Sequence, residues 1–259
     1  MGKQRVNNIF KNNKDILSIY LTAGYPYLDS MPELAVTLVN SGADFLELGM
    51  PFSDPLADGE TIQYSSSIAM KNGITLEKYF DQVTLLRQKV EIPLIFMGYF
   101  NQLLRYGVEK FLEKCVKTGI DGMIIPDLPA GFYEQKYKML FGKYDLSMSF
   151  LVTPTTAESR IKYLDELSTG FVYLVSSSST TGKADVFPKE QVEYFDRIKK
   201  LQLKNPVVIG FGISDRNKFL IANKYADGAI IGSAFIKALE SDGKYLLKAK
   251  NFVNKILGK

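Results

Sequence analysis

Residues 46–59 read LELGMPFSDPLADG, and this stretch changes character in its middle. Up to Gly49 the residues are mostly apolar, as in a short buried strand. After Gly49 the stretch is rich in Pro, Ser, Asp and Gly, which favour turns. A carboxylate, Glu47, therefore lies near the C-terminal end of a buried strand, and a second one, Asp58, ends the loop that follows. Carboxylates are costly to bury without a partner or a function.

The composition of the 259 residues excludes several classes of protein. A net charge of +4 is too small and too dispersed to indicate nucleic-acid binding. No apolar run is long enough to span a bilayer, and the polar N-terminal residues do not resemble a secretory signal. The single Cys115 leaves no intrachain disulfide and suits a reducing compartment. We expect a cytoplasmic protein that binds neither nucleic acid nor membrane.

The chain has no histidine. This excludes metal sites built on His, as well as Ser-His and Cys-His nucleophile systems. Acid–base chemistry must then come from Asp, Glu, Lys, Tyr or Cys. We expect no metal site.

Short apolar segments alternate with amphipathic ones along the whole chain. Eight segments have the length and composition of buried strands: 16–24, 44–49, 93–99, 122–127, 147–153, 171–176, 206–212 and 228–233. Helical spacing predicts helices at 31–40, 76–90, 103–117, 132–144, 157–167, 190–201, 215–225 and 246–257. This pattern predicts an α/β fold, a TIM (β/α)8 barrel, as one domain over residues 1–259, with an additional N-terminal helix and short extra helices. The alternative, a doubly wound open sheet, lacks its G-x-G-x-x-G after the first strand.

Active sites of such barrels lie at the C-terminal ends of the strands. The predicted strands contain no Lys or Arg, and their acids are Asp44, Glu47 and Asp127. Asp44 opens its strand, whereas Glu47 and Asp127 lie late in theirs. Alternation places Glu47 on the face opposite to Leu46 and Leu48, so it points into the barrel if those leucines pack on helices.

Each acid also has a purely structural interpretation. Glu47 could pair with a cation from a loop, and loop structure explains Asp127 nearly as well as catalysis does. Asp58 could cap a helix that starts near Glu60, because Asp-Gly is a turn pair. For Asp58 both interpretations stay open.

The absence of a strand Lys limits the mechanism. A Schiff-base aldolase needs a Lys at the barrel mouth, and a metal aldolase usually needs His. A carbon–carbon lyase built here would need a substrate that carries its own electron sink, with carboxylates moving protons.

Glycine-rich turns predict a phosphate site. Gly212 lies in a GFGIS segment that ends the seventh strand, Gly232 and Ser233 end the eighth, and Gly182 lies in the loop after the sixth. Backbone N–H groups at such turns bind phosphate without Lys or Arg, and barrel enzymes often place phosphate after strands seven and eight. The alternative is that these are tight turns only.

Apolar and aromatic side chains fall late in several strands and suit a flat apolar substrate, although each is also explained as plain core. They are Tyr20, Met97, Tyr99, Ile124, Val152, Tyr173 and Phe211.

The stretch 46–59 closely resembles the signature of the tryptophan synthase alpha chain family. Further segments resemble the family in the same order: TAGYP at 22–26, MGYFN at 97–101, IPDLP at 125–129, GFGIS at 210–214 and IIGSA at 230–234.

The resemblance implies cleavage of indole-3-glycerol phosphate to indole and D-glyceraldehyde 3-phosphate, the penultimate step of L-tryptophan biosynthesis. The family's general acid/base, which protonates indole C3 and helps deprotonate the side-chain hydroxyl, corresponds to Glu47. The Asp that stabilises the indole N–H corresponds to Asp58. Tyr173 matches an active-site Tyr, and Tyr20 stands where the family usually has Phe. Thr181 matches a lid Thr that contacts the loop Asp.

The implied phosphate positions are Gly182, Gly212, Gly232 and Ser233. The chain departs from the family at Ser177 and Ser179, where well-known members have Arg and Gly. The resemblance in the lid therefore does not include these two positions.

The resemblance also implies a partner, a beta chain that holds pyridoxal phosphate and receives indole in an α2β2 heterotetramer. This chain would bind no cofactor itself, and its contact surface would comprise residues 50–58, Asn101 and the Pro129 region. Two alternatives remain. One is another phosphate-binding barrel isomerase or lyase, which need not have the acid pair, and the other is a subunit with weakened activity that activates a beta chain.

Overall fold

The computed structural model describes residues 2–176, 187–240 and 244–259, and within these ranges nine parallel strands form one sheet. The order of the strands is β5-β4-β3-β2-β1-β9-β8-β7-β6. Their bounds are β1 Ile16–Thr22, β2 Phe45–Gly49, β3 Leu94–Met97, β4 Gly122–Ile124, β5 Ser147–Ser149, β6 Leu151–Val152, β7 Val172–Val175, β8 Val207–Gly210 and β9 Gly228–Ile231.

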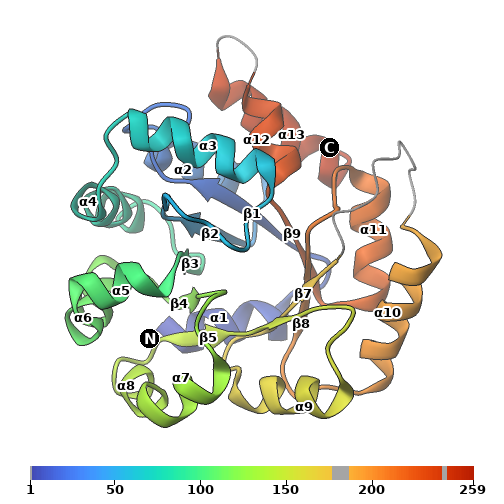
Figure 1. Cartoon of the computed structure of the whole chain (residues 1–259). Helices are drawn as coiled ribbons and strands as arrows, with labels where there is room; N and C mark the ends of the chain where they lie inside the picture. The colour runs from blue at the N-terminus through green and yellow to red at the C-terminus, as the bar shows by residue number, and fades with distance from the viewer. Residues whose placement is uncertain (1, 177–186, 241–243) are drawn as a thin grey trace.

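The sheet closes through one continuous segment. Only Phe150 separates β5, which pairs with β4, from β6, which pairs with β7. The carbonyl of Phe150 accepts a hydrogen bond from the Tyr173 N–H at 3.0 Å, so this residue also takes part in the pairing with β7. The predicted fifth strand is therefore present but interrupted, and the predicted (β/α)8 barrel is confirmed (Figure 1).

Apart from α1, the helices form an outer ring around the strands (Figure 1). Their bounds are α1 Gly2–Asn12, α2 Met31–Ser41, α3 Glu60–Lys71, α4 Leu76–Arg87, α5 Phe100–Tyr106, α6 Val108–Thr118, α7 Ala130–Lys136, α8 Lys138–Lys143, α9 Glu158–Leu167, α10 Lys189–Lys200, α11 Arg216–Tyr225, α12 Ser233–Leu239 and α13 Tyr245–Leu257. None of the helices in the described ranges has the length and apolarity needed to cross a membrane.

Two predicted helices are each wrong as single elements. Residues 103–117 contain the end of α5 and most of α6, because Gly107 between them has a φ of 89°. Residues 132–144 contain parts of α7 and α8, which meet at Tyr137. The last predicted strand also extended too far, since Ser233 is the first residue of α12.

Helix α1 closes the barrel at the end where the strands begin. The Phe10 ring lies 6.3 Å from the Phe45 ring and 6.0 Å from the Phe171 ring, and these two rings are 5.5 Å apart. Phe45 opens β2, and Phe171 directly precedes β7. These rings keep water out of the lower barrel, which leaves the opposite end free for a site.

An ion cluster supports the same closed end. The Asp121 carboxylate, which is 1% exposed, pairs with Arg5 of α1 and with Arg87 at the end of α4. The Arg87 Nη2–Asp121 Oδ2 distance is 2.6 Å, and the same oxygen accepts the Leu94 N–H at 2.9 Å. One buried carboxylate thus joins α1, α4, β3 and β4.

We expect Asp121→Ala to lower the free energy of unfolding by about 3 kcal/mol, because two partly buried guanidinium groups would lose their counter-charge. Urea denaturation measures this. The control is Glu113→Ala, which breaks the exposed pair of Glu113 with Lys117 and should change stability little. Equal effects of the two substitutions would contradict the structural role of Asp121.

Candidate active site

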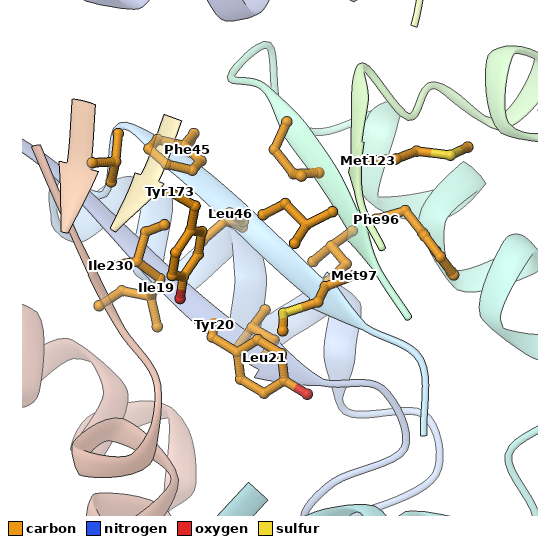
Figure 2. Packing of buried hydrophobic residues seen from close by; sticks show 14 of the residues in the cluster. Ile19, Tyr20, Leu21, Phe45, Leu46, Phe96, Met97, Met123, Tyr173 and Ile230 are labelled. Atoms are coloured by element: carbon orange, nitrogen blue, oxygen red, sulfur yellow. The ribbon is translucent and has the colours of Figure 1, made fainter. Parts of the chain in front are cut away.

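A cavity of about 390 Å³ opens at the C-terminal ends of the strands, opposite α1. Residues from both halves of the chain line it. Those predicted from the sequence are Tyr20, Glu47, Asp58, Met97, Tyr173, Phe211, Gly212, Gly232 and Ser233. Figure 2 shows Tyr20, Met97 and Tyr173 projecting to the inner side of the strands, whereas Phe96 and Met123 extend towards the helices.

Glu47 points into this cavity from β2, as the alternation of the strand predicted. Its side chain is buried, with Oε1 lacking a hydrogen-bond partner, and no ion pair is found for it in the described ranges. The loop-cation interpretation therefore fails for that part of the chain. Burial, and secondly the nearby Asp58 carboxylate, raise the pKa of Glu47 to about 8. Glu47 is accordingly protonated at neutral pH.

Asp58 reaches the cavity from the end of the loop after β2. Its Oδ2 accepts a hydrogen bond of 3.0 Å from the Tyr99 hydroxyl, which in turn accepts the Ala57 N–H at 3.1 Å. Burial raises the pKa of Asp58, and the Tyr99 hydrogen bond partly opposes this shift. The capping interpretation is wrong, because Gly59 is the N-cap of α3 and the Asp58 carboxylate accepts its hydrogen bond from Tyr99 instead.

The loop between the two acids is held by the start of α5. The Phe52 ring stacks on the Tyr99 ring, with centroids 5.1 Å apart and an interplanar angle of 25°. Gln102 Nε2 donates to the Pro51 carbonyl at 2.9 Å, while its Oε1 accepts the Tyr99 N–H at 3.0 Å. Tyr99 thus acts on the site through Asp58 and the loop.

Five other predicted positions lie outside the cavity lining, including Tyr99, described above, and Val152, which is fully buried in β6. Ile124 is fully buried in β4. Asp127 Oδ1 accepts the Phe100 N–H at 2.8 Å at the start of α5, and Asp44 Oδ2 accepts the Leu17 N–H at 2.8 Å. Both aspartates therefore have structural partners. Within the described ranges, no group of three or more Cys, Asp or Glu side chains could hold a metal ion.

Two tyrosines in the cavity lie against glycines of neighbouring strands. A Cβ placed on Gly49 would be 2.1 Å from the Tyr20 hydroxyl oxygen, and one on Gly210 would be 2.1 Å from that of Tyr173. The glycines leave room for the rings, a role of Gly210 that the sequence did not reveal. Burial, the largest cause, raises the pKa of both hydroxyls well above the ordinary value, so they stay neutral.

The opposite side of the cavity combines glycine turns with two cations. Phe211 and Gly212 have φ values of 69° and 73°, and Ser176 Oγ donates to the Phe211 carbonyl at 2.6 Å. Lys218 and Lys237 also line the cavity, and sequence reasoning missed them. Lys218 follows Gly212 by six residues and Lys237 follows Gly232 by five, each in the first turns of the next helix, and helical side chains lean back towards the N-terminus. That spacing was the available signal.

Four positions singled out in the sequence lie outside the described residues. They are Ser177, Ser179, Thr181 and Gly182.

The raised pKa of Glu47 makes stability depend on pH. Folded Glu47 keeps its proton up to about pH 8, whereas the unfolded chain releases it near 4.5. The unfolded state therefore binds fewer protons in this window, and the Glu47 contribution to the unfolding free energy falls as pH rises from 4.5 to about 8.

We expect Glu47→Gln to remove this slope. Between pH 4.5 and about 8, the unfolding free energy of the variant should rise relative to that of the wild type by a few kcal/mol, which is the free energy that corresponds to the shift in pKa. Urea denaturation at successive pH values measures the difference. Glu113→Gln, at an exposed site, should track the wild type, and a Glu47→Gln curve parallel to the wild type would exclude a buried, protonated Glu47.

Comparisons with known proteins agree with the geometry. The family model "Tryptophan synthase alpha chain" matches residues 6–256. Curated relatives of that name include one from Christiangramia forsetii, 54% identical over 92% of this chain and 93% of its own length. Another, from Flavobacterium johnsoniae, is 51% identical over 97% and 99%.

Solved structures show the same likeness. The crystal structure of a tryptophan synthase complex from Pyrococcus furiosus has a chain that is 35% identical, with a TM-score of 0.87 over 95% of this chain and 99% of that one. A tryptophan synthase from M. tuberculosis is 29% identical, with a TM-score of 0.86 over 98% and 97%. The chain therefore belongs to the tryptophan synthase alpha chain family.

Proposed function

We propose that this chain cleaves indole-3-glycerol phosphate to indole and D-glyceraldehyde 3-phosphate, the step before the last in L-tryptophan biosynthesis, with Glu47 and Asp58 as its catalytic residues. Membership of the tryptophan synthase alpha chain family supports this activity. The observation that supports the residue assignment is Glu47 itself, a buried carboxyl group with one unpaired oxygen in the cavity. An unpaired buried polar group is costly unless a ligand uses it.

In the net reaction one proton moves from the side-chain hydroxyl to indole C3, and Glu47 carries it in two steps. Protonated Glu47 donates its proton to indole C3, which turns the ring into an iminium ion. The resulting Glu47 carboxylate takes the proton from the side-chain hydroxyl, and the carbon–carbon bond breaks with its electron pair returning to the indole. Glu47 ends protonated, as it began. A pKa of about 8 keeps the donor form abundant at neutral pH.

Asp58 supplies the charge that the iminium ion needs. The negative carboxylate accepts the indole N–H and stabilises the positive charge that develops on the nitrogen. The Tyr99 hydroxyl holds one oxygen of Asp58 in place, which reduces the reorganisation needed during the reaction. The substrate supplies its own electron sink, so neither a Lys Schiff base nor a metal is required.

The remaining positions bind the two ends of the substrate. The indole ring contacts side chains of the cavity, namely Tyr20, Met97, Tyr173 and Phe211. Gly212, Gly232 and Ser233 offer backbone and hydroxyl donors to the phosphate. Gly182 and Thr181 remain proposals from the family resemblance. Tyr99 and Ile124 do not line the cavity, and we leave both out of the substrate set.

Glu47→Gln should lower kcat for indole release by roughly 10²–10⁴-fold, because it removes the transferable proton. Asp58→Asn should cost roughly 10²–10³-fold, because it removes charge stabilisation. Indole release from indole-3-glycerol phosphate measures both.

The matched control is Glu60→Gln, an exposed acid directly after the same loop, which should stay within about twofold of the wild type. Circular dichroism should show all three variants folded. Indole release by Glu47→Gln at the wild-type rate would refute the assignment of the acid.

A beta chain of the same enzyme is the proposed partner, in an α2β2 assembly that holds pyridoxal phosphate in the beta chain only. The exposed tip of the 50–58 loop supports this proposal, since Leu56 is 86% exposed. Asn101 and Pro129 are exposed as well. A cytoplasmic location fits this assembly. Neither alternative gains support, because an unrelated barrel isomerase need not have the acid pair and both acids are retained.

Leu56→Glu should weaken the binding of the cognate beta chain roughly tenfold or more, because a buried contact would become a desolvated charge. The isolated chain should keep its own activity. Titration calorimetry measures the affinity. The control is Leu85→Glu on α4, at a side chain that is 52% exposed and outside the proposed surface. Equal binding by Leu56→Glu and wild type would exclude this surface.

A further inference from the structure

Two lysines in the cavity have no role in the chemistry described so far. Lys218, on α11, is half-buried, and Lys237, on α12, is exposed at the rim. Neither forms an ion pair within the described ranges, although Glu240 lies only three residues after Lys237. In the part of the chain that the structure describes, both are therefore cavity-lining cations without an ion-pair partner.

Lys218 is also placed against local helix preference. It lies in the first turn of α11, where the N-cap Asp215 accepts its backbone N–H at 3.0 Å. A cation near the positive N-terminal end of a helix is unfavourable, and this turn has no acidic residue. The neighbouring Arg216 is accounted for, because its Nη1 donates to the Ile256 carbonyl at the end of α13. Within the described residues the Lys218 ammonium group has no such partner, and only the N-cap Asp215 carboxylate offsets its unfavourable position at this helix start.

The charges divide the cavity into two sides. Glu47 and Asp58 come from β2 and its loop, whereas Lys218 and Lys237 come from the helices after β8 and β9. Because Glu47 is protonated, the negative charge of the first side is that of Asp58, which repels a doubly charged phosphate, whereas the two lysines attract it. An apolar ring with a single N–H suits the first side. Fixed charges of opposite sign can thus orient a substrate before close contact is made.

We propose that Lys218 and Lys237 bind the substrate phosphate as its cationic partners, beside the glycine turns, and thereby set the orientation of the substrate in the cavity. This inference rests on the proposed function and extends it. The backbone donors at Gly212 and Gly232 give the phosphate its position. The lysines give it counter-charge, which neutral N–H groups do not provide.

The kinetic test uses Lys218→Gln, Lys237→Gln and the double variant. Each single change should raise KM for indole-3-glycerol phosphate roughly fivefold, and the double change more than tenfold, with kcat within about twofold, because uniform binding is lost. Lys218→Arg should restore a near wild-type KM. The matched control is Lys224→Gln, an exposed lysine on the same helix that does not line the cavity, which should leave KM unchanged.

Salt gives an independent readout. KM of the wild type should rise with ionic strength, and KM of the double variant should rise less, because the screened charges are already gone. A wild-type KM and salt dependence in the double variant would overturn the proposal.

Direct binding separates this proposal from the catalytic one. Glycerol 3-phosphate should bind the wild type at least about fivefold more tightly than it binds the double variant, whereas indole should bind both equally. If the wild type failed to cleave indole-3-glycerol phosphate, the proposed function would fail, and this binding comparison would still decide the role of the lysines. Equal glycerol 3-phosphate affinities would overturn that role.

Discussion

The burial of the Glu47 carboxyl group beside Asp58 is the constraint on which the active end of this barrel depends. A carboxylate at that place would be both desolvated and repelled, so the group holds a proton at neutral pH. The protonated form is what a general acid needs. The same burial leaves Oε1 of Glu47 without a hydrogen-bond partner, which costs free energy that the rest of the fold must offset.

The packing and ion-pair contacts at the other end of the barrel can offset this cost. Helix α1 covers the N-terminal ends of the strands, and Phe10, Phe45 and Phe171 fill the space behind it. The Asp121 cluster fixes α1 to the strand starts. These stabilising contacts lie at the N-terminal ends of the strands, away from the cavity. Barrels of this fold typically separate a stabilising face from the face that holds the active site. The cavity end can then hold a buried, protonated Glu47 with an unpaired oxygen beside the Asp58 carboxyl group.

The loop after β2 contains both the proposed catalytic Asp58 and the proposed partner surface. Tyr99 and Gln102 hold its ends, so Asp58 is directed inward while Leu56 at the tip is directed to solvent. Because both residues belong to one short segment, a partner that contacts the tip can influence the position of Asp58. The physical link is the stacking of Phe52 on Tyr99, since Tyr99 also donates to Asp58.

The sequence by itself determined the eight strand segments, the inward direction of Glu47 and the exclusion of His-based and strand-Lys chemistry. These features depend on periodicity and composition, which can be read from one segment of the sequence without knowing how the segments pack together. It missed the breaks at Gly107 and Phe150. Only the tertiary structure decided that Asp58 reaches the cavity instead of capping α3 and that two lysines on α11 and α12 converge on that cavity. The physical reason is that periodicity reports which face a residue occupies, whereas distances between separate elements depend on how loops and helices pack around the closed barrel.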